Sequence, residues 1–185
     1  MLDLARIESG QLAMSIEPVP LSAVLDEALD LLRPQAAEHG VSLPAGSPVP
    51  TDVHVSADQQ RLLQIFLNLM SNAVKYNVDG GSVTLDHEER PGGRLRVSIT
   101  DTGPGIAFED IERIFLPFER LSVAGAAVEG TGLGLAVSKR LAETMGAGIG
   151  LTNAPDQGST FWVELILAQC WNVVSVCPDR TSWSP

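Results

Sequence analysis

Two asparagines and a lysine at helical spacing form the most chemically suggestive pattern in this sequence. Asn68, Asn72 and Lys75 recur at intervals of four and three residues, with Gln64 one turn earlier, so all four share one side of a helix. Amide oxygens suit a hard cation such as Mg²⁺, and an ammonium group suits a phosphate. The alternative is a structural polar patch that is satisfied within the protein, because such groups are costly to bury without partners.

These four residues, called the polar seam below, lie between two apolar flanks of a helix expected from Ala57-Asp58 to about Tyr76. Because both flanks are apolar, the helix should pack on two sides and present the seam between them. The residues of the first flank are Leu62, Phe66, Leu69, Met70 and Ala73, and those of the second are Leu63, Leu67 and Val74.

A glycine-rich loop, Asp101-Thr-Gly103-Pro-Gly105, directly follows a predicted strand. Glycines let the backbone turn sharply and approach a ligand closely. A carboxylate at the end of the strand can accept a hydrogen bond from an exocyclic amine such as N6 of adenine. The alternative interpretation is a tight surface turn with a solvated aspartate.

A second glycine-rich segment, Gly130-Thr-Gly132-Leu-Gly134, leads into a helix expected over 131–145. Glycines at a helix N-terminus expose free backbone amides, and the helix dipole adds partial positive charge, which suits a phosphate. The alternative is a close helix–sheet contact that needs no side chains. Neither G-x-G-x-x-G nor G-x-x-x-x-G-K-[ST] occurs, which disfavours the two common nucleotide-binding folds.

The segment between the two glycine motifs, residues 107–130, combines phenylalanines with a run of small residues. Such a run makes a poor rigid element, so a mobile flap is one interpretation and an ordinary irregular loop is the other. Arg120 is the cation of this segment best placed in the sequence to reach an anion.

The remaining elements must position these motifs. A helix is expected over Leu21 to about Glu38, with Ser22 as N-cap and His39-Gly40 as its end. A hairpin is expected from strands 82–88 and 94–100, and a closing strand pair from 150–153 and 159–167. Short strands at 41–43 and 53–55, an extended segment at 11–20 and a short helix at 107–114 complete the expected pattern.

Composition limits the function classes. The chain has 185 residues, of which 44% are hydrophobic, which fits one domain with a core and additional ends. Its net charge of −11 without a basic cluster disfavours nucleic-acid binding. No apolar run is long enough for a membrane segment, and no signal-peptide pattern begins the chain, so the cytoplasm is the default location.

The sequence contains, in order, five motifs that together resemble the N, G1, F, G2 and G3 boxes of two-component sensor histidine kinases. Each box is weak alone, but the ordered set is highly specific, and the resemblance covers residues 1 to about 167. The boxes are Asn68-Leu-Met-Ser-Asn72-Ala-Val-Lys75-Tyr76, Asp101-Thr-Gly103-Pro-Gly105, Phe115-Leu-Pro-Phe118, Gly130-Thr-Gly132-Leu-Gly134-Leu and Gly158-Ser-Thr160.

The resemblance implies an α+β class fold, the Bergerat ATP-binding fold shared with gyrase, Hsp90 chaperones and MutL. This fold is a two-layer α/β sandwich, in which a mixed, mostly antiparallel sheet carries helices on one face. The implied cofactors are ATP and Mg²⁺. The implied activity is transfer of the γ-phosphoryl group of ATP to a histidine on a dimerisation domain, for relay to the receiver domain of a response regulator.

The resemblance also implies residue roles. Asn72 is the expected Mg²⁺ ligand, with Asn68 as its polar companion, and Lys75 acts with both in catalysis. Asp101 is expected to bind the adenine amine. The other expected nucleotide-binding residues are Tyr76 against the nucleotide, Gly103 and Gly105 around the adenine, Arg120 at the phosphates, Gly130, Thr131, Gly132, Leu133 and Gly134 around the triphosphate, and Thr160 at the pocket floor.

The domain boundaries follow from the same resemblance. We expect 1–10 to be the end of a second dimerisation helix, 11–20 a linker, and 21–167 the ATP-binding domain with a lid at 107–130. Residues 168–185 match nothing in the family, so a disordered tail or an altered reading of a natural C-terminus is expected there. A metal or redox pair formed by Cys170 and Cys177 is the alternative for this tail.

The phosphoacceptor histidine of the family should lie upstream of this chain. His87 begins a near-match to an acceptor box, but it is expected at the end of a strand, and His39 and His54 are expected to be surface or strand residues. The chain is therefore either a fragment of a longer kinase or a kinase acting in trans, and we expect a monomer. Alternatives are a nucleotide-binding interaction module without kinase activity and an ATPase or serine kinase of the anti-sigma type.

Overall fold

The structure is a computed structural model that describes residues 13–107, 110–111, 113–118, 132–153 and 158–168. Several predictions therefore lie outside the described residues. They are the helix end at 1–10, most of the lid, the tail, and Arg120, Gly130, Thr131, Cys170 and Cys177.

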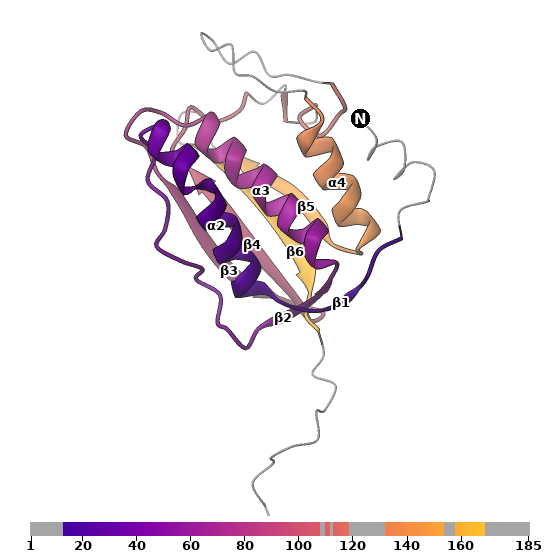
Figure 1. The fold of residues 1–185 in the computed structure, drawn as a ribbon. Helices are drawn as coiled ribbons and strands as arrows, with labels where there is room; N and C mark the ends of the chain where they lie inside the picture. The colour runs from indigo at the N-terminus through magenta and orange to yellow at the C-terminus, as the bar shows by residue number, and fades with distance from the viewer. Residues whose placement is uncertain (1–12, 108–109, 112, 119–131, 154–157, 169–185) are drawn as a thin grey trace, which may run out of the picture.

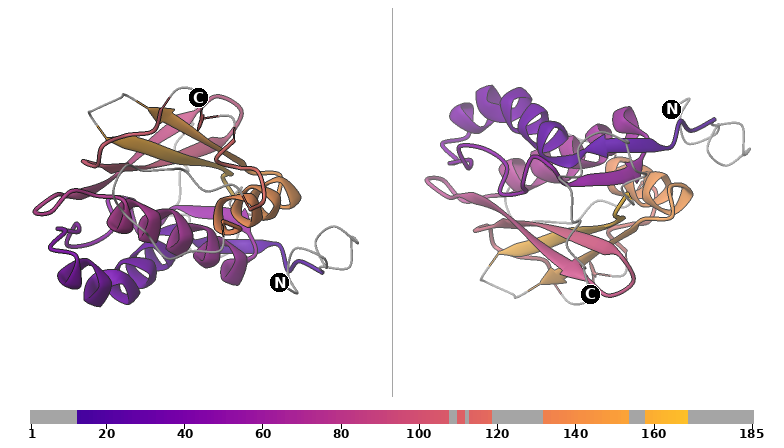
Figure 2. Two further views of the ribbon diagram at one scale, coloured as in Figure 1. Left: turned by 90° about the horizontal axis from the view of Figure 1, so that it is seen from above. Right: turned by 90° about the horizontal axis from the view of Figure 1, so that it is seen from below.

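In the described residues the chain folds into two layers, a four-stranded antiparallel sheet and three helices on one of its faces (Figures 1 and 2). The strand order is β3-β4-β6-β5, with β3 at Val83–Arg90, β4 at Arg94–Asp101, β5 at Gly148–Asn153 and β6 at Ser159–Ile166. The helices are α2 at Leu21–Glu38, α3 at Gln59–Lys75 and α4 at Gly134–Thr144. The predicted α+β sandwich with helices on one face is confirmed.

A second, two-stranded sheet lies beside the first. Its strands, β1 at Glu17–Pro20 and β2 at His54–Ala57, are antiparallel, and a bridge between Val55 and Leu167 joins it to the end of β6. The last four residues of the expected linker thus pair with the domain. The strand expected at 41–43 is reduced to one parallel bridge, Ser42 to Ser82.

Helix α2 begins one residue earlier than its predicted cap. Pro20 is the N-cap, and Ser22 is 5% exposed inside the helix, so the predicted capping role of Ser22 is wrong. The proline fixes an extended backbone before Leu21 and can start the helix without a side-chain cap. The predicted end is confirmed, because His39 is the C-cap and Gly40 follows with a φ of 64°.

The core lies between the helices and the inner face of the sheet. Alternate residues of β4 and β6 are buried there, as the period of a strand requires. The first flank of α3 is fully buried with them, whereas Leu63 and Leu67 of the second flank are half-buried. The buried strand residues are Leu95, Val97, Ile99, Phe161, Val163 and Leu165.

The helix predicted at 107–114 lies partly outside the described residues, and the described positions form hydrogen-bonded turns. Asp110 N donates to the Ala107 carbonyl at 3.0 Å, and Arg113 N donates to the Asp110 carbonyl at 2.9 Å. These two bonds span three residues, as in a 3₁₀ turn, and Ile114 N donates to the same Asp110 carbonyl at 3.0 Å across four residues, as in one turn of an α-helix.

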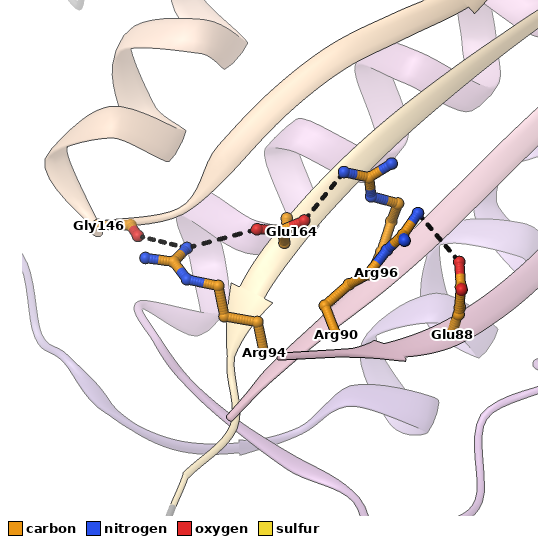
Figure 3. A network of polar contacts seen from close by, with 6 residues as sticks. All are labelled: Glu88, Arg90, Arg94, Arg96, Gly146 and Glu164. Carbon is orange, nitrogen blue, oxygen red and sulfur yellow. Dashed lines mark hydrogen bonds and ion pairs between the residues drawn. The ribbon is translucent and has the colours of Figure 1, made fainter. Parts of the chain in front are cut away.

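The outer face of the sheet carries a polar network (Figure 3). Glu164 of β6 lies 3.0 Å from Arg96 and 3.9 Å from Arg94 of β4, and Arg94 also donates to the Gly146 carbonyl at 3.3 Å. The Arg96 guanidinium stacks 4.1 Å above the Trp162 ring. The network ties the turn between α4 and β5 to the centre of the sheet, at the end opposite Asp101.

Candidate functional site

Asp101 closes β4 as a buried carboxylate, 5% exposed. Its Oδ1 accepts hydrogen bonds from Gly103 N at 2.8 Å and Ser159 N at 3.3 Å. Burial raises the pKa of the Asp101 carboxyl above its ordinary value, and hydrogen bonds from the backbone of Gly103, Ser159 and Asp101 itself oppose that shift. A buried carboxylate at the end of a strand is suited to a ligand that donates a hydrogen bond.

The loop after Asp101 is packed against the end of α3. A Cβ on Gly103 would lie 2.5 Å from the Tyr76 carbonyl oxygen, so no larger residue fits there without movement. Gly105 has a φ of 75°, which favours glycine. On the other side of Asp101, a Cβ on Gly158 would collide with the backbone of Asp101 itself. Three glycines thus let three segments converge on one carboxylate.

A polar clamp holds this end of α3 in place. Asn77 donates to the carbonyls of Ala73 and Ser82 at 3.1 and 3.0 Å, and its Oδ1 accepts from Thr102 Oγ1 at 3.0 Å. Thr102 Oγ1 in turn accepts from Ser82 N at 2.9 Å. Tyr76, 39% exposed at the C-cap of α3, therefore has a fixed place relative to Asp101.

The other end of the polar seam meets the second glycine motif. Asn68 donates through Nδ2 to Ser138 Oγ at 2.9 Å, and a Cβ on Gly134 would collide with the Asn68 amide. Helix α4 begins at Gly134 with Leu133 as its N-cap and no side-chain cap bond. Its first backbone amides are therefore available to a ligand.

The seam residues between these two ends are half-buried. Asn72 and Lys75 have no side-chain hydrogen bond or ion pair with any residue that the structure describes. The structural alternative, a patch satisfied by neighbouring groups, is therefore not seen for these two side chains within the described ranges. An amide oxygen and an ammonium group remain to bind a ligand.

The phenylalanine motif contacts the second glycine motif. Phe118 N donates to the Gly132 carbonyl at 3.0 Å, and both residues have left-handed backbones, with φ values of 64° and 68°. The Lys139 ammonium of α4 lies 5.6 Å from the Phe115 ring centre. This segment therefore ends beside the start of α4.

The motifs converge although long stretches of sequence separate them, and this arrangement is matched by known proteins. Residues 57–169 match the family described as "Histidine kinase-, DNA gyrase B-, and HSP90-like ATPase". The chain belongs to this family of ATPases. Their catalytic domain in sensor histidine kinases has the fold described above.

Two relatives illustrate the match in sequence. The chain is 37% identical to sensor protein GacS of Pseudomonas syringae pv. syringae over 171 residues, which is 90% of this chain and 19% of that protein. It is 33% identical to the signal transduction histidine-protein kinase BarA of Escherichia coli K12, over 97% of this chain and 20% of that protein. The chain therefore spans about a fifth of the length of these kinases.

Solved structures of this ATPase family agree. Full-length ShkA, in complex with AMPPNP, has a TM-score of 0.75 and 37% identity, over 90% of this chain and 34% of that chain. The mycobacterial sensor histidine kinase MprB has a TM-score of 0.69 and 25% identity, over 83% of this chain and 98% of that chain.

The structure places the side chain of one predicted residue on the face of the sheet opposite to Asp101. Thr160 alternates with the buried residues of β6, and its hydroxyl lies 2.9 Å from Thr100 Oγ1, so its side chain points to the outer face of the sheet. Ser159, 5% exposed, is the residue of this motif that faces inward, and its N–H reaches Asp101. Alternation with Phe161 and Val163 in the sequence could have identified it.

Other contributors were also missed. Asn77, Thr102 and Ser138 were not predicted as site residues, although Ser138 stands one helical turn after Gly134 and could have been placed beside the seam.

The three histidines are exposed, and His87 pairs with Val97 within the sheet. Across the described ranges, no helix is long and apolar enough to span a bilayer.

Proposed function

We propose that this domain binds ATP with Mg²⁺ and transfers the γ-phosphoryl group to a histidine on a dimerisation domain, for relay to a response regulator receiver domain. The observation that carries the proposal is the buried Asp101 carboxylate, enclosed by three glycine positions near the end of helix α3, where Asn72 and Lys75 have no side-chain partner among the described residues. The proposed catalytic domain is 21–167, with 1–10 and 11–20 as its connection to the dimerisation domain.

In this proposal Asp101 Oδ2 accepts a hydrogen bond from the adenine amine, and the Ser159 backbone fixes the carboxylate. The Thr160 role at the pocket floor passes to Ser159. Gly103 and Gly105 keep the loop close to the base, and the exposed Tyr76 ring lies against the nucleotide. Hydrogen bonding to a charged acceptor in a buried site gives selectivity for adenine over guanine.

The phosphates would lie between the polar seam and the start of α4. Lys75 supplies positive charge, and the amides after Gly132 and Leu133 supply donors along the helix dipole. Arg120, Gly130 and Thr131 remain predicted contributors that lie outside the described residues. These groups position and neutralise the triphosphate, which is most of what phosphoryl transfer requires.

The residues fit a Mg²⁺ ion held mainly by phosphates. In the part of the chain that the structure describes, no cluster of three His, Cys, Asp or Glu side chains could hold a metal. Mg²⁺ commonly takes one or two protein oxygens together with substrate phosphates and water, and the Asn72 amide oxygen is the proposed protein ligand. When bound, the ion neutralises charge that develops on the phosphates.

Nucleotide binding tests the first half of the proposal. Titration calorimetry with ATP and Mg²⁺ should give a specific affinity that falls about tenfold to a hundredfold in Asp101→Asn, the range for a lost charge-assisted hydrogen bond. Asp86→Asn removes the same charge from an exposed position on β3 and should bind like the wild type. Equal affinity in Asp101→Asn and wild type would refute the assignment.

Phosphotransfer tests the second half. The chain is mixed with a dimerisation domain that carries an acceptor histidine, and labelled ATP is added. Acid-labile, base-stable phosphate on that domain is the expected product. Binding without transfer would favour a nucleotide-binding interaction module, and acid-stable phosphate on a serine-bearing partner would favour the anti-sigma type of activity.

A further inference from the structure

We propose that Ser138 is a positioning residue, which fixes the orientation of the Asn68 side chain and thereby couples α4 to the polar seam. The proposal rests on the ATP-binding function proposed above. Ser138 lies on α4 and was not predicted to contact the nucleotide, so this role in the site is a new one.

The carrying observation is a partly buried hydrogen bond between two helices. Ser138 is 2% exposed, and its Oγ accepts from Asn68 Nδ2 at 2.9 Å. The neighbouring contacts between α3 and α4 are apolar, with Leu141 and Ala142 of α4 in the same core as Leu69 and Ala73 of α3. A polar pair in such a contact has few alternative partners, so its geometry is well defined.

Gly134 confines the amide on its other side. Because a Cβ on Gly134 would collide with Asn68 Oδ1, the amide oxygen lies directly against the first residue of α4. Gly134 and Ser138 are one helical turn apart. The Asn68 amide is therefore held between two successive turns of α4, with Nδ2 toward Ser138 and Oδ1 toward the start of the helix.

The chemistry of the two side chains explains why a serine is needed. An amide has two ends of similar shape, and the hydrogen-bond partner decides which end points where. A serine in a helix can give its own proton to the carbonyl of the preceding turn, and its oxygen then accepts from the amide nitrogen. Ser138 thus directs the Asn68 oxygen toward the place where α4 begins.

The consequence for the site is a mechanical link. The polar seam lies on α3, and the second glycine motif precedes α4. The two are far apart in the sequence, since Gly134 stands 66 positions after Asn68. With the amide held by α4, a displacement of the start of α4 also displaces Asn68. Without Ser138, Asn68 can rotate away, and the polar companion of Asn72 loses its fixed direction.

A double-mutant cycle on ATP affinity tests the link. Ser138→Ala should weaken ATP binding in the presence of Mg²⁺ by about threefold to tenfold, the range for one net hydrogen bond. In an Asn68→Ala background the same substitution should have no further effect. Ser71→Ala is the matched control, because it removes a hydroxyl that donates to Gln35 of α2 at 3.1 Å, away from α4.

Equal losses in the two backgrounds would show that Ser138 acts independently of Asn68 and would overturn the proposal, as would an unchanged affinity in Ser138→Ala. A wild-type chain that binds no ATP would instead refute the proposed function. A second measurement does not depend on the variant folding. In the wild-type domain, the Asn68 side-chain amide protons should show a nuclear Overhauser contact to Ser138 and slowed exchange, and their absence would also overturn the proposal.

Discussion

Gly103 lies against the backbone carbonyl of Tyr76 with no room for a side chain between them. A Cβ at this position would be 2.5 Å from the Tyr76 oxygen and 2.8 Å from Asp101 Oδ1. The glycine is therefore required by the packing of the β4 loop onto the end of α3, and the same contact brings the proposed adenine-binding carboxylate to the polar seam.

Gly103→Ala should disturb both stability and nucleotide binding. Forcing an atom into this contact moves the loop away from α3 at a cost of about 1–3 kcal/mol in the free energy of unfolding, and it displaces Asp101. Urea unfolding and calorimetry measure the two effects. The control is Gly148→Ala, whose Cβ would make only ordinary contacts, 3.5 Å from Trp162 and 3.6 Å from Glu164. Similar behaviour of the two variants would contradict the prediction.

The stability of the nucleotide-free domain should depend on pH through Asp101. Because burial raises the pKa of this carboxyl in the folded state, the folded protein binds the proton more tightly than the unfolded chain. The resulting contribution to stability is present at low pH and is lost as pH rises through the folded-state pKa. Near neutral pH, Asp101→Asn should therefore be more stable than the wild type while binding ATP less well.

The difference in unfolding free energy between Asp101→Asn and wild type should narrow as pH is lowered from about 7 to about 4, toward the ordinary pKa of an aspartate. Denaturant titrations at several pH values measure it, with Asp86→Asn as the control for removal of one negative charge. If the difference in unfolding free energy instead grew as the pH was lowered, the direction given for the pKa shift of Asp101 would be wrong.

The hydrogen bonds made by Asn77 and by Thr102 in the polar clamp at the end of α3 should be energetically coupled. Asn77→Ala removes two donors and one acceptor in half-buried positions, so the free energy of unfolding should fall by about 1–3 kcal/mol. Thr102→Val should cost less in an Asn77→Ala background than in the wild type. Thr84→Val, at an exposed position of β3, is the control, and strictly additive losses for Asn77 and Thr102 would argue against a clamp.

On the outer face, packing should outweigh the ion pairs. A Cβ on Gly150 would collide with the Trp162 ring, on which the Arg96 guanidinium also stacks, so Gly150→Ala should cost about 1–3 kcal/mol. Glu164→Gln breaks two partly exposed ion pairs and should cost less than about 1 kcal/mol, with a loss that salt diminishes. Urea unfolding at low and high salt compares them, and a larger, salt-independent loss in Glu164→Gln would reverse this ranking.

Much of the architecture could be predicted from local patterns. The helical period of the apolar residues around Asn68 and Asn72 was sufficient to place α3, and strand alternation placed β3, β4 and β6. Glycine motifs marked the loops because left-handed or crowded backbones need glycine, as at Gly105 and Gly132. These features depend on interactions between residues close in the sequence, which is why the sequence alone determined them and the family they indicate.

Other features depended on which distant segments meet. Pro20 rather than Ser22 is the N-cap of α2, where β1 pairs with β2. The inward position of Ser159 and the outward position of Thr160 follow from the register of β6 against β4. The Asn68 to Ser138 bond exists because α3 and α4 pack side by side. Only the tertiary structure decided these points. The partner of a side chain depends on which segments pack together in space, and the sequence does not give the distance between segments that lie far apart along the chain.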